Sequence, residues 1–272
     1  MIYSNLWIAL AALTMTWQTQ LLLTNRFFIT EFTVFVFCAT LLLYAVHRLI
    51  NLQKSAILQQ QARFITITSF QRVLQTVGFL SVIIVIFLFF KFDAWLQLAL
   101  CIPIFCAAGY ALPILPGQKR LRDINFLKNV LIAGVWTWIT VVLPVLELQM
   151  PVNQGVVLMG VGRFCFIFAL SLAFDVRDVN LDQQSQVRTI PVAIGILKTK
   201  IIAFALIAIT FICVSINWLS VFYNFNDWLG ISITLIITYY LIANAAPEKP
   251  DFYYAGLLDG TMILQFLLVW LL

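Results

Sequence analysis

The sequence is poor in charged residues. Of its 272 residues, 10% are Asp, Glu, Lys or Arg and 63% are hydrophobic, whereas an average soluble domain has about 25% charged and roughly 45–50% apolar residues. A water-soluble fold has too little interior to bury so large an apolar fraction. The composition therefore excludes an ordinary soluble domain and indicates a chain whose main solvent is lipid.

Histidine is almost absent, and the cysteines lack ligand spacing. The single histidine, His47, excludes a bis-histidine haem site and a multi-histidine metal site within one chain. The five cysteines all fall within apolar runs and form no CxxC pair, so we expect them to be small core residues. A bound metal ion must then be held by carboxylates.

The sequence also shows neither the pattern of a cleavable signal peptide nor a linker between domains. Its first basic residue is Arg26, so the apolar run 6–23 has no positively charged segment ahead of it, as a cleavable signal peptide would. We interpret this run as a membrane span. No Gly-, Ser- or Pro-rich linker, low-complexity tract or internal repeat is present, which predicts a single transmembrane domain over residues 1–272.

Most of the sequence consists of long apolar runs. A helix needs about 20 mostly apolar residues to cross a bilayer, and the chain has nine such runs, at residues 6–23, 30–51, 73–90, 94–112, 126–146, 156–178, 200–218, 227–245 and 256–272. We expect short turns at 151–155 and 223–227, and a short amphipathic helix within 53–72. The sequence thus predicts an all-α, multi-pass transmembrane bundle of about nine spans.

The basic residues are unevenly distributed between the two sides of this bundle. One set of links carries nearly all of them, and the opposite set carries only Arg26 and Lys91. The positive-inside rule then predicts a bacterial-type inner membrane protein with a cytoplasmic amino end and an external carboxyl end. The net charge of +5 is spread over short links, which argues against nucleic acid and favours membrane lipids or a phosphorylated substrate as partners.

One basic residue, Arg163, falls inside the sixth apolar run. Its guanidinium is either a buried counter-charge or a group that extends along the helix to the outer interface. We expect the second arrangement, because a long side chain can place its charge in water while its stem stays in lipid.

Three carboxylates follow one another at the end of the sixth run. Asp175, Asp178 and Asp182 are three and four residues apart, which places them on one face of a helix. Clustered carboxylates repel one another unless a cation compensates them, and oxygen ligands suit Mg²⁺. The sequence therefore predicts a magnesium site. The alternative is a solvated helix end at which the aspartates pair with Arg177 and Arg188.

The same residues resemble a known family. Asp175-x-x-Asp178-x-x-x-Asp182, followed by Arg188-Thr189-Ile190-Pro191-Val192, resembles the second aspartate-rich motif of the UbiA superfamily of intramembrane prenyltransferases. A further match follows the fourth run, where Tyr110-Ala111-Leu112-Pro113, Lys119-Arg120 and Leu127-Lys128-Asn129 resemble the link that faces the diphosphate in this family. The resemblance implies a UbiA-like fold, Mg²⁺ on the three aspartates, and diphosphate contacts from Tyr110, Lys119, Arg120 and Arg188.

The first aspartate-rich motif of the family is replaced in this chain. Where the family has NDxxDxxxD at the end of the second span, this sequence places Tyr44, His47 and Asn51, which share one helical face, with Arg48 beside them. These side chains offer hydrogen-bond donors to anionic oxygens, so we assign them to substrate binding. The alternative is a lipid-interface arginine beside a histidine satisfied by neighbouring helices.

The resemblance implies an enzyme that transfers a prenyl group from an isoprenoid diphosphate to a lipophilic or aromatic acceptor. Asp175, Asp178 and Asp182 would then be the catalytic and metal-binding residues, and stabilisation of the leaving diphosphate would drive the reaction. The alternative is a catalytically inactive membrane protein that binds isoprenoids or another phosphorylated lipid as an accessory factor.

Overall fold

Helices account for all the regular secondary structure in the part of the chain that the structure describes. The computed structural model describes residues 5–54, 71–111, 121, 124 and 126–272, and no strand occurs within these ranges. The all-α expectation is therefore confirmed. Most of the segment in which we expected an amphipathic helix, 53–72, lies outside the described residues.

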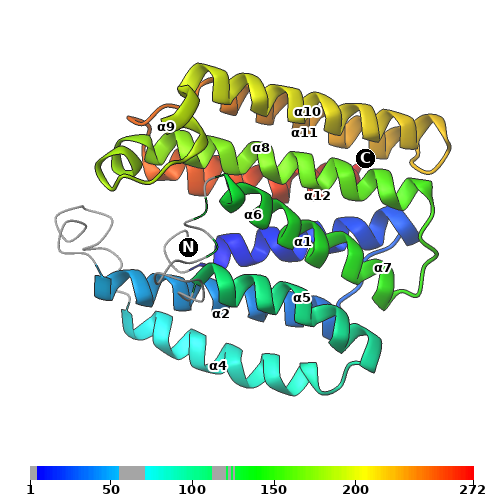
Figure 1. Ribbon diagram of the computed structural model, residues 1–272. Coiled ribbons are helices and arrows are strands. Elements are labelled where there is room, and N and C mark those ends of the chain that lie inside the picture. Colours follow the sequence, from blue (N-terminus) through cyan, green and yellow to red (C-terminus); the bar gives the residue numbers. More distant parts are fainter. Residues whose placement is uncertain (1–4, 55–70, 112–120, 122–123, 125) are drawn as a thin grey trace.

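The described helices follow the predicted apolar runs closely (Figure 1). They are α1 (Leu6–Thr24), α2 (Glu31–Lys54), α4 (Gln71–Phe89), α5 (Ala94–Ala111), α6 (Leu127–Thr137), η4 (Trp138–Val142), α7 (Leu143–Glu147), α8 (Gln154–Gln184), α9 (Ile190–Ile194), α10 (Ile196–Leu219), α11 (Phe225–Ala243), η5 (Tyr253–Leu258) and α12 (Asp259–Leu271). The run α6–η4–α7 is continuous, and so is η5–α12.

Six of the described helical runs are long and apolar enough to cross a bilayer, which makes this an integral membrane protein. In α2, α4 and α5 the described apolar stretches are shorter, at Glu31–Val46, Gln75–Phe89 and Ala94–Tyr110. The number of helices that cross the membrane and the orientation of the termini stay predictions.

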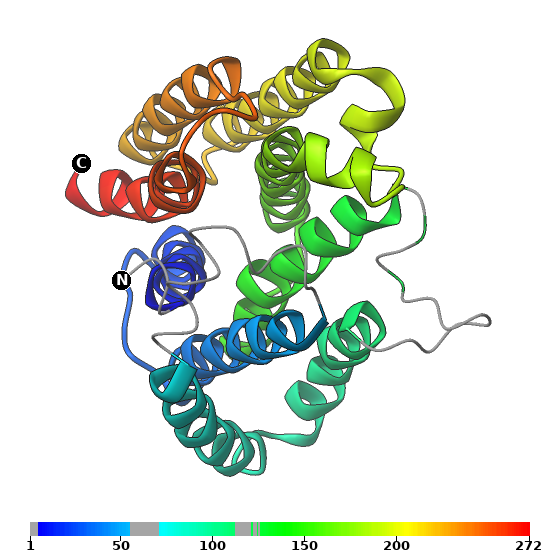
Figure 2. The ribbon, with the colours of Figure 1, turned by 90° about the vertical axis from the view of Figure 1, so that its left-hand side faces the viewer.

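The long helices form a ring in chain order, seen end-on in Figure 2. Each packs mainly on its neighbours: α1 on α2, α2 on α4, α6 on α8, α8 on α10, α10 on α11 and α11 on α12. The ring is closed by α12, which packs on α1, and the Trp7 indole N–H donates to the Gly256 carbonyl at 3.1 Å across this contact.

Local sequence signals set the ends of the helices. The Asn153 side chain accepts a hydrogen bond from the Val156 amide at 3.0 Å and caps α8. Asn224 and Asp227 form a reciprocal capping box at the start of α11. Two short turns are thus confirmed, but they lie at 148–153 and 220–224 rather than at 151–155 and 223–227, because the two asparagine caps start the helices earlier than we expected.

The fifth apolar run contains a stretch of π-helix, which is wider than an α-helix, just before a proline. Residues Trp138–Val142 are π-helical, and Pro144 begins the next turn, where it has no amide hydrogen to donate. The Trp138 indole N–H donates to the Ala99 carbonyl at 2.9 Å. This bond ties η4 to α5 and fixes one wall of the cavity described below.

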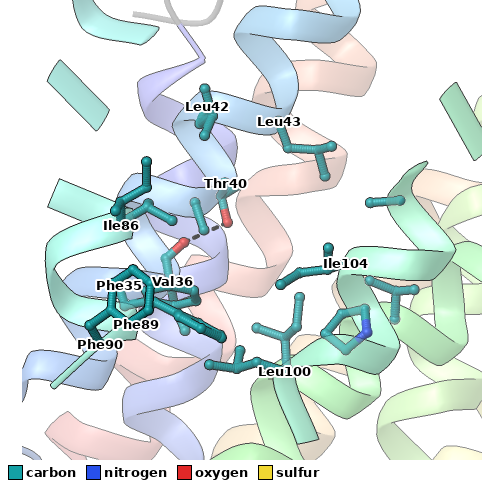
Figure 3. A pocket seen from close by; sticks show the side chains of 16 residues that line it. Phe35, Val36, Thr40, Leu42, Leu43, Ile86, Phe89, Phe90, Leu100 and Ile104 are labelled. Carbon is teal, nitrogen blue, oxygen red and sulfur yellow. Dashed lines mark hydrogen bonds between the residues drawn. The ribbon is translucent and has the colours of Figure 1, made fainter. Parts of the chain in front are cut away.

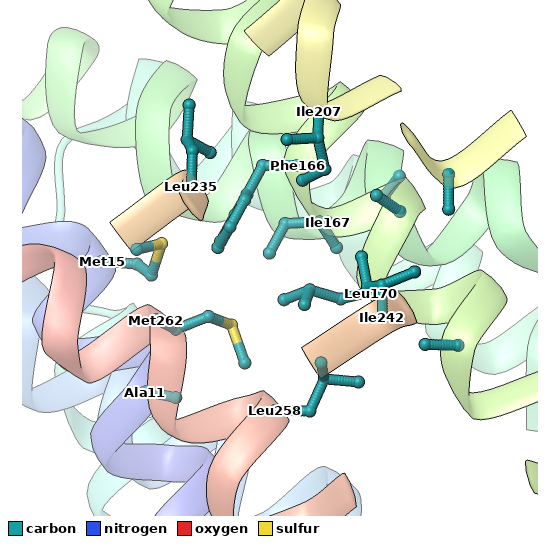
Figure 4. Packing of buried hydrophobic residues seen from close by; sticks show 14 of the residues in the cluster. Ala11, Met15, Phe166, Ile167, Leu170, Ile207, Leu235, Ile242, Leu258 and Met262 are labelled. Atoms are coloured by element: carbon teal, nitrogen blue, oxygen red, sulfur yellow. The ribbon is translucent and has the colours of Figure 1, made fainter. Parts of the chain in front are cut away.

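The buried apolar residues form two clusters. The larger, shown in Figure 4, lies between α1, α8, α10, α11 and α12 and includes Met15, Phe166, Leu170, Leu258 and Met262. The smaller joins α1, α2, α4, α5 and α7 and has as its buried members Ala12, Phe32, Phe35, Val36, Leu88, Leu96, Leu100 and Leu143. All five cysteines are free, and three of them are buried, in agreement with their expected role as small packing residues.

The expected position of Arg163 is wrong. The side chain is only 5% exposed, and its Nη1 donates to the Met15 carbonyl at 3.1 Å while its Nη2 donates to Gln18 Oε1 at 2.9 Å. Polar acceptors on α1 thus hold the guanidinium inside the bundle, so it does not reach the outer interface.

The contact between α11 and α12 gives a first prediction. A Cβ atom added at Gly230 would lie 3.0 Å from the backbone of Leu268 and Val269, whereas one added at Gly134 would meet nothing within 4 Å. We expect Gly230→Ala to destabilise the protein by roughly 1–3 kcal/mol, because the two helices must move apart. Gly134→Ala, the matched control, should be neutral or stabilising by up to about 1 kcal/mol. Thermal unfolding in detergent measures both, and equal midpoints for the two variants would contradict the close approach.

Candidate functional site

The acidic segment lies on the last turns of α8. We expected this helix to end near residue 178, but it continues to Gln184. Asp175, Asp178 and Asp182 therefore all lie on regular helix, and their spacing places them along one side of it. We call the end of the bundle that carries these three residues the acidic end.

Asp175 is fully buried, and side chains from α6 compensate its charge. Its carboxylate accepts from Lys128 Nζ at 2.6 Å and from Asn129 Nδ2 at 2.9 Å. The same Asn129 amide also donates to Ser171 Oγ at 3.1 Å. Because Asp175 is 0% exposed, removing Lys128 would leave a charge without solvent or a cation to stabilise it.

Asp178 is paired with its own neighbour in sequence. Arg177 Nε and Nη2 donate to the two carboxylate oxygens at 2.7 and 2.8 Å. The guanidinium also lies over the rings of Phe174 and Tyr254, at 5.0 and 5.6 Å from their centroids. The alternative in which the aspartates pair with arginines is therefore correct for Asp178 and Arg177.

Asp182 is the least compensated of the three. Its Oδ2 is buried near the Thr189 hydroxyl. Neither Asp182 Oδ2 nor Thr189 Oγ1 makes a hydrogen bond. The carboxylate is attracted by the Lys128 ammonium and repelled by the other two aspartates. The three carboxylates thus lie close enough to interact, with Lys128 as the cation they share.

These residues are not arranged as a ready magnesium site. Among the described residues, no group of three or more His, Cys, Asp or Glu side chains is placed to hold a metal ion. Asp175 faces an ammonium and an amide, and Asp178 faces a guanidinium. The described side chains therefore do not fit a three-carboxylate metal site in this arrangement, and the assignment of Mg²⁺ to them stays a prediction.

A large apolar cavity lies between α2, α4, α5, α6 and η4 (Figure 3). We call it the chamber; its volume is about 590 Å³, and its walls are formed by Phe35, Val36, Ala39, Thr40, Leu42, Leu43, Val85, Ile86, Phe89, Phe90, Leu100, Pro103, Ile104, Ala107, Val135 and Ile139. The Thr40 hydroxyl donates to the Val36 carbonyl at 2.8 Å within its own helix. The chamber therefore suits a hydrocarbon chain.

A smaller cavity of about 180 Å³ adjoins the chamber. It shares the wall residues Leu43, Ala107 and Val135 with the chamber and is also lined by Tyr44 and Tyr110. Tyr110 lies within electrostatic reach of Lys128. The two adjoining cavities thus form an apolar space with two tyrosines in its wall, and one of them, Tyr110, interacts electrostatically with Lys128.

The structure describes only some of the other predicted site residues. Tyr44 and Tyr110 line the smaller cavity, and Arg188 is exposed in the link after α8. The side chains of His47, Arg48 and Asn51, on the last turns of α2, lie outside the described residues, as do Lys119 and Arg120.

Sequence reasoning did not assign a role to Lys128 or Asn129, the two residues that contact Asp175. The available signal was the Leu127-Lys128-Asn129 segment, which resembled the diphosphate-facing link of the UbiA superfamily. The segment alone did not show that its side chains turn toward α8.

The buried ion pair gives a second prediction. Asp175→Leu alone leaves Lys128 unpaired, and Lys128→Met alone leaves a buried carboxylate, so each should cost about 3–5 kcal/mol of stability. The double variant removes both charges and should be much less destabilised than the sum of the single variants. Unfolding midpoints in detergent measure this cycle. Additive effects would contradict a direct pairing between the two groups.

Comparisons with known proteins bear on the fold. No model of a protein family matches the sequence, and no curated protein matches it. Solved structures do resemble the fold: a digeranylgeranylglyceryl phosphate synthase superposes with a TM-score of 0.64 at 14% identity, over 99% of this chain and 96% of that one.

Two archaeal UbiA homologues are also similar. One, from Archaeoglobus fulgidus and bound to GPP and Mg²⁺, has a TM-score of 0.60 at 12% identity, covering 99% of each chain. The other, an apo structure from Aeropyrum pernix, has a TM-score of 0.56 at 12% identity, over 98% of this chain and 93% of that one. The chain therefore has the fold of the UbiA-type intramembrane prenyltransferases, as the motif around Asp175 implied.

Proposed function

We propose that this protein transfers a prenyl group from an isoprenoid diphosphate to a lipophilic or aromatic acceptor. The observation that carries the proposal is the pair of cavities that share Leu43, Ala107 and Val135, the smaller of which is lined by Tyr110, a residue within electrostatic reach of Lys128. An isoprenoid diphosphate has the same division into a long apolar tail and a compact anionic head.

The chamber supports binding of the tail. Its volume of about 590 Å³ lies within the range of roughly 300–1,000 Å³ that is typical of ligand pockets. Each methylene moved from water into such a space contributes about 0.8 kcal/mol. Because the walls bind any hydrocarbon, the space available beyond Ala107 would set the preferred chain length.

Lys128 and Tyr110 support binding of the diphosphate. The Lys128 side chain is 28% exposed although its ammonium is bonded to Asp175, so an incoming anion can approach it. Tyr110 lines the smaller cavity and lies within electrostatic reach of Lys128. Together these groups offer a positive charge and a hydroxyl donor to phosphate oxygens.

The chemistry follows from this placement. The bond between the allylic carbon and the diphosphate oxygen breaks, and its electron pair leaves with the diphosphate, whose charge the Lys128 ammonium stabilises. The acceptor then forms a bond to the allylic carbon, and its proton passes to a diphosphate oxygen. The Trp136 ring lines the smaller cavity and would shelter the allylic cation, an interaction of about 0.5–2 kcal/mol.

Solved relatives support the substrate class. Structures of the Archaeoglobus fulgidus homologue hold GPP or DMAPP together with Mg²⁺. From the sequence we assign the same metal to Asp175, Asp178 and Asp182 in this chain. Since the described side chains do not form that site, the metal dependence has to be measured directly.

A second function is favoured by the charge balance of the acidic end. Asp175 and Asp178 are already paired with cations, and the family's first aspartates are replaced by Tyr44, His47 and Asn51. This arrangement suits an accessory protein that binds an isoprenoid or another phosphorylated lipid without turnover.

Release of diphosphate separates the two functions. Purified protein supplied with geranylgeranyl diphosphate, membrane lipid extract as the acceptor source and Mg²⁺ should release diphosphate, and Asp178→Asn, which removes one of the three carboxylates that we assign to Mg²⁺, should abolish this release. Omitting Mg²⁺ tests the metal assignment. Asp93→Asn is the matched control: this residue caps α5 by accepting from the Leu96 amide at 2.7 Å, and asparagine caps equally well. Binding without release would support the accessory function, and the absence of both would exclude the two proposals together.

Chain-length preference gives a further prediction. Ala107 lines both cavities, so Ala107→Phe should obstruct the passage between them. We expect binding of geranylgeranyl diphosphate to weaken by about 10–100-fold, while dimethylallyl diphosphate, whose tail does not need the chamber, is little affected. Competition binding with both compounds on the same variant supplies the internal control. An equal loss for the two would place the tail elsewhere.

A further inference from the structure

A second group of buried polar residues surrounds Arg163, on the same helix as the acidic segment. Arg163 precedes Asp175 by twelve residues in α8, which corresponds to about 18 Å along the helix axis. Its guanidinium bonds to the Met15 carbonyl at 3.1 Å and to Gln18 Oε1 at 2.9 Å, with a longer contact of 3.4 Å to Thr140 Oγ1. Every one of these acceptors is neutral.

No described carboxylate balances this charge. The ion pairs formed between described residues join Glu31 to Lys91, Asp175 to Lys128 and Asp178 to Arg177, and none includes Arg163. The guanidinium is nevertheless 95% buried within a membrane-spanning helix. Burying an ion without a counter-charge costs several kcal/mol even when neutral groups hydrogen-bond to it.

A small cavity lies against the guanidinium. Its volume is about 20 Å³, which is room for a particle of the size of one or two water molecules. Its polar wall residues come from α1, α8, α10, the α10–α11 link and α12: Gln18, Arg163, Thr210, Asn217, Tyr223 and Gln265. A phosphate group or a substrate carboxylate is too large for this space.

One donor and one acceptor in the cavity wall have no hydrogen-bond partner, namely Gln18 Nε2 and Asn217 Oδ1. Gln18 is 0% exposed, and while its Oε1 accepts from Arg163, its Nε2 makes no hydrogen bond. A buried donor left unpaired costs about 1–3 kcal/mol. Gln18 and Arg163 thus supply an unsatisfied N–H group and an uncompensated positive charge to the same small space.

We propose that this cavity binds a small monovalent anion of the halide class, such as chloride. The anion accepts from Gln18 Nε2 and neutralises the Arg163 guanidinium, whereas a water molecule would satisfy the amide and leave the charge unbalanced. By joining α1 to α8, the bound anion would stabilise the bundle. The site is independent of the proposed prenyl transfer, since it shares no residue with the chamber or the acidic end.

The proposed anion site is tested by measuring how the thermal stability of the protein depends on chloride concentration. The thermal midpoint of the purified protein is measured in detergent while sodium chloride replaces sodium gluconate at constant ionic strength. We expect a rise of several degrees that saturates with chloride concentration and is reproduced by bromide. Crystals grown in bromide should show an anomalous scattering peak beside Arg163.

Two variants locate the effect. Gln18→Glu supplies a fixed carboxylate next to the guanidinium, so this variant should be stable in gluconate and insensitive to chloride. Arg163→Gln should also lose the chloride response. Arg26→Gln, the control, removes an exposed cation near the same end of the bundle and should retain the full response.

Either of two results would overturn the proposal. Equal wild-type midpoints in chloride and gluconate, with no bromide peak, would show that the cavity holds only water. A chloride response that persists in Gln18→Glu would place the anion elsewhere on the protein.

Discussion

The pairing of Asp175 with Lys128 constrains the rest of the acidic end. A carboxylate that is 0% exposed within an apolar bundle depends on its immediate partners for stability, and both partners come from the first turn of α6. The pair therefore fixes the position of α6 relative to α8. Because Val135 and Ile139 continue the α6–η4 run into the wall of the chamber, the same contact also helps to position the apolar space.

The three aspartates have different surroundings despite their regular spacing. Asp175 faces α6, Asp178 is bound to Arg177, whose guanidinium lies over the Tyr254 ring of η5, and Asp182 has a buried oxygen without a hydrogen bond. The negative charge of each carboxylate is thus compensated by neighbouring groups to a different extent. A ligand that brings new charge to this end would meet its strongest competition at Asp175 and its weakest at Asp182.

Much of the fold was predictable from the sequence because lipid imposes a simple pattern. The apolar runs located the helices, and Asn153 and Asn224 supplied the caps that the predicted turns require. Contacts between distant segments were harder to predict. Hydropathy falls at Asp178, yet α8 continues to Gln184, and a linear pattern does not reveal that acceptors on α1 hold Arg163 inside the bundle. For the same reason Asp175 was recognised as a candidate while its partner Lys128 was not assigned.

The two apolar clusters divide the bundle into parts with different freedom to vary. The larger cluster surrounds α8 and includes residues next to Asp175, whereas the smaller one joins α1, α2, α4, α5 and α7 and shares Phe35, Val36 and Leu100 with the chamber wall. Substitutions in the smaller cluster can reshape the chamber without disturbing the packing that supports the charged groups. The shape of the chamber and the pairing of the buried charges can therefore vary at separate sets of positions within one chain.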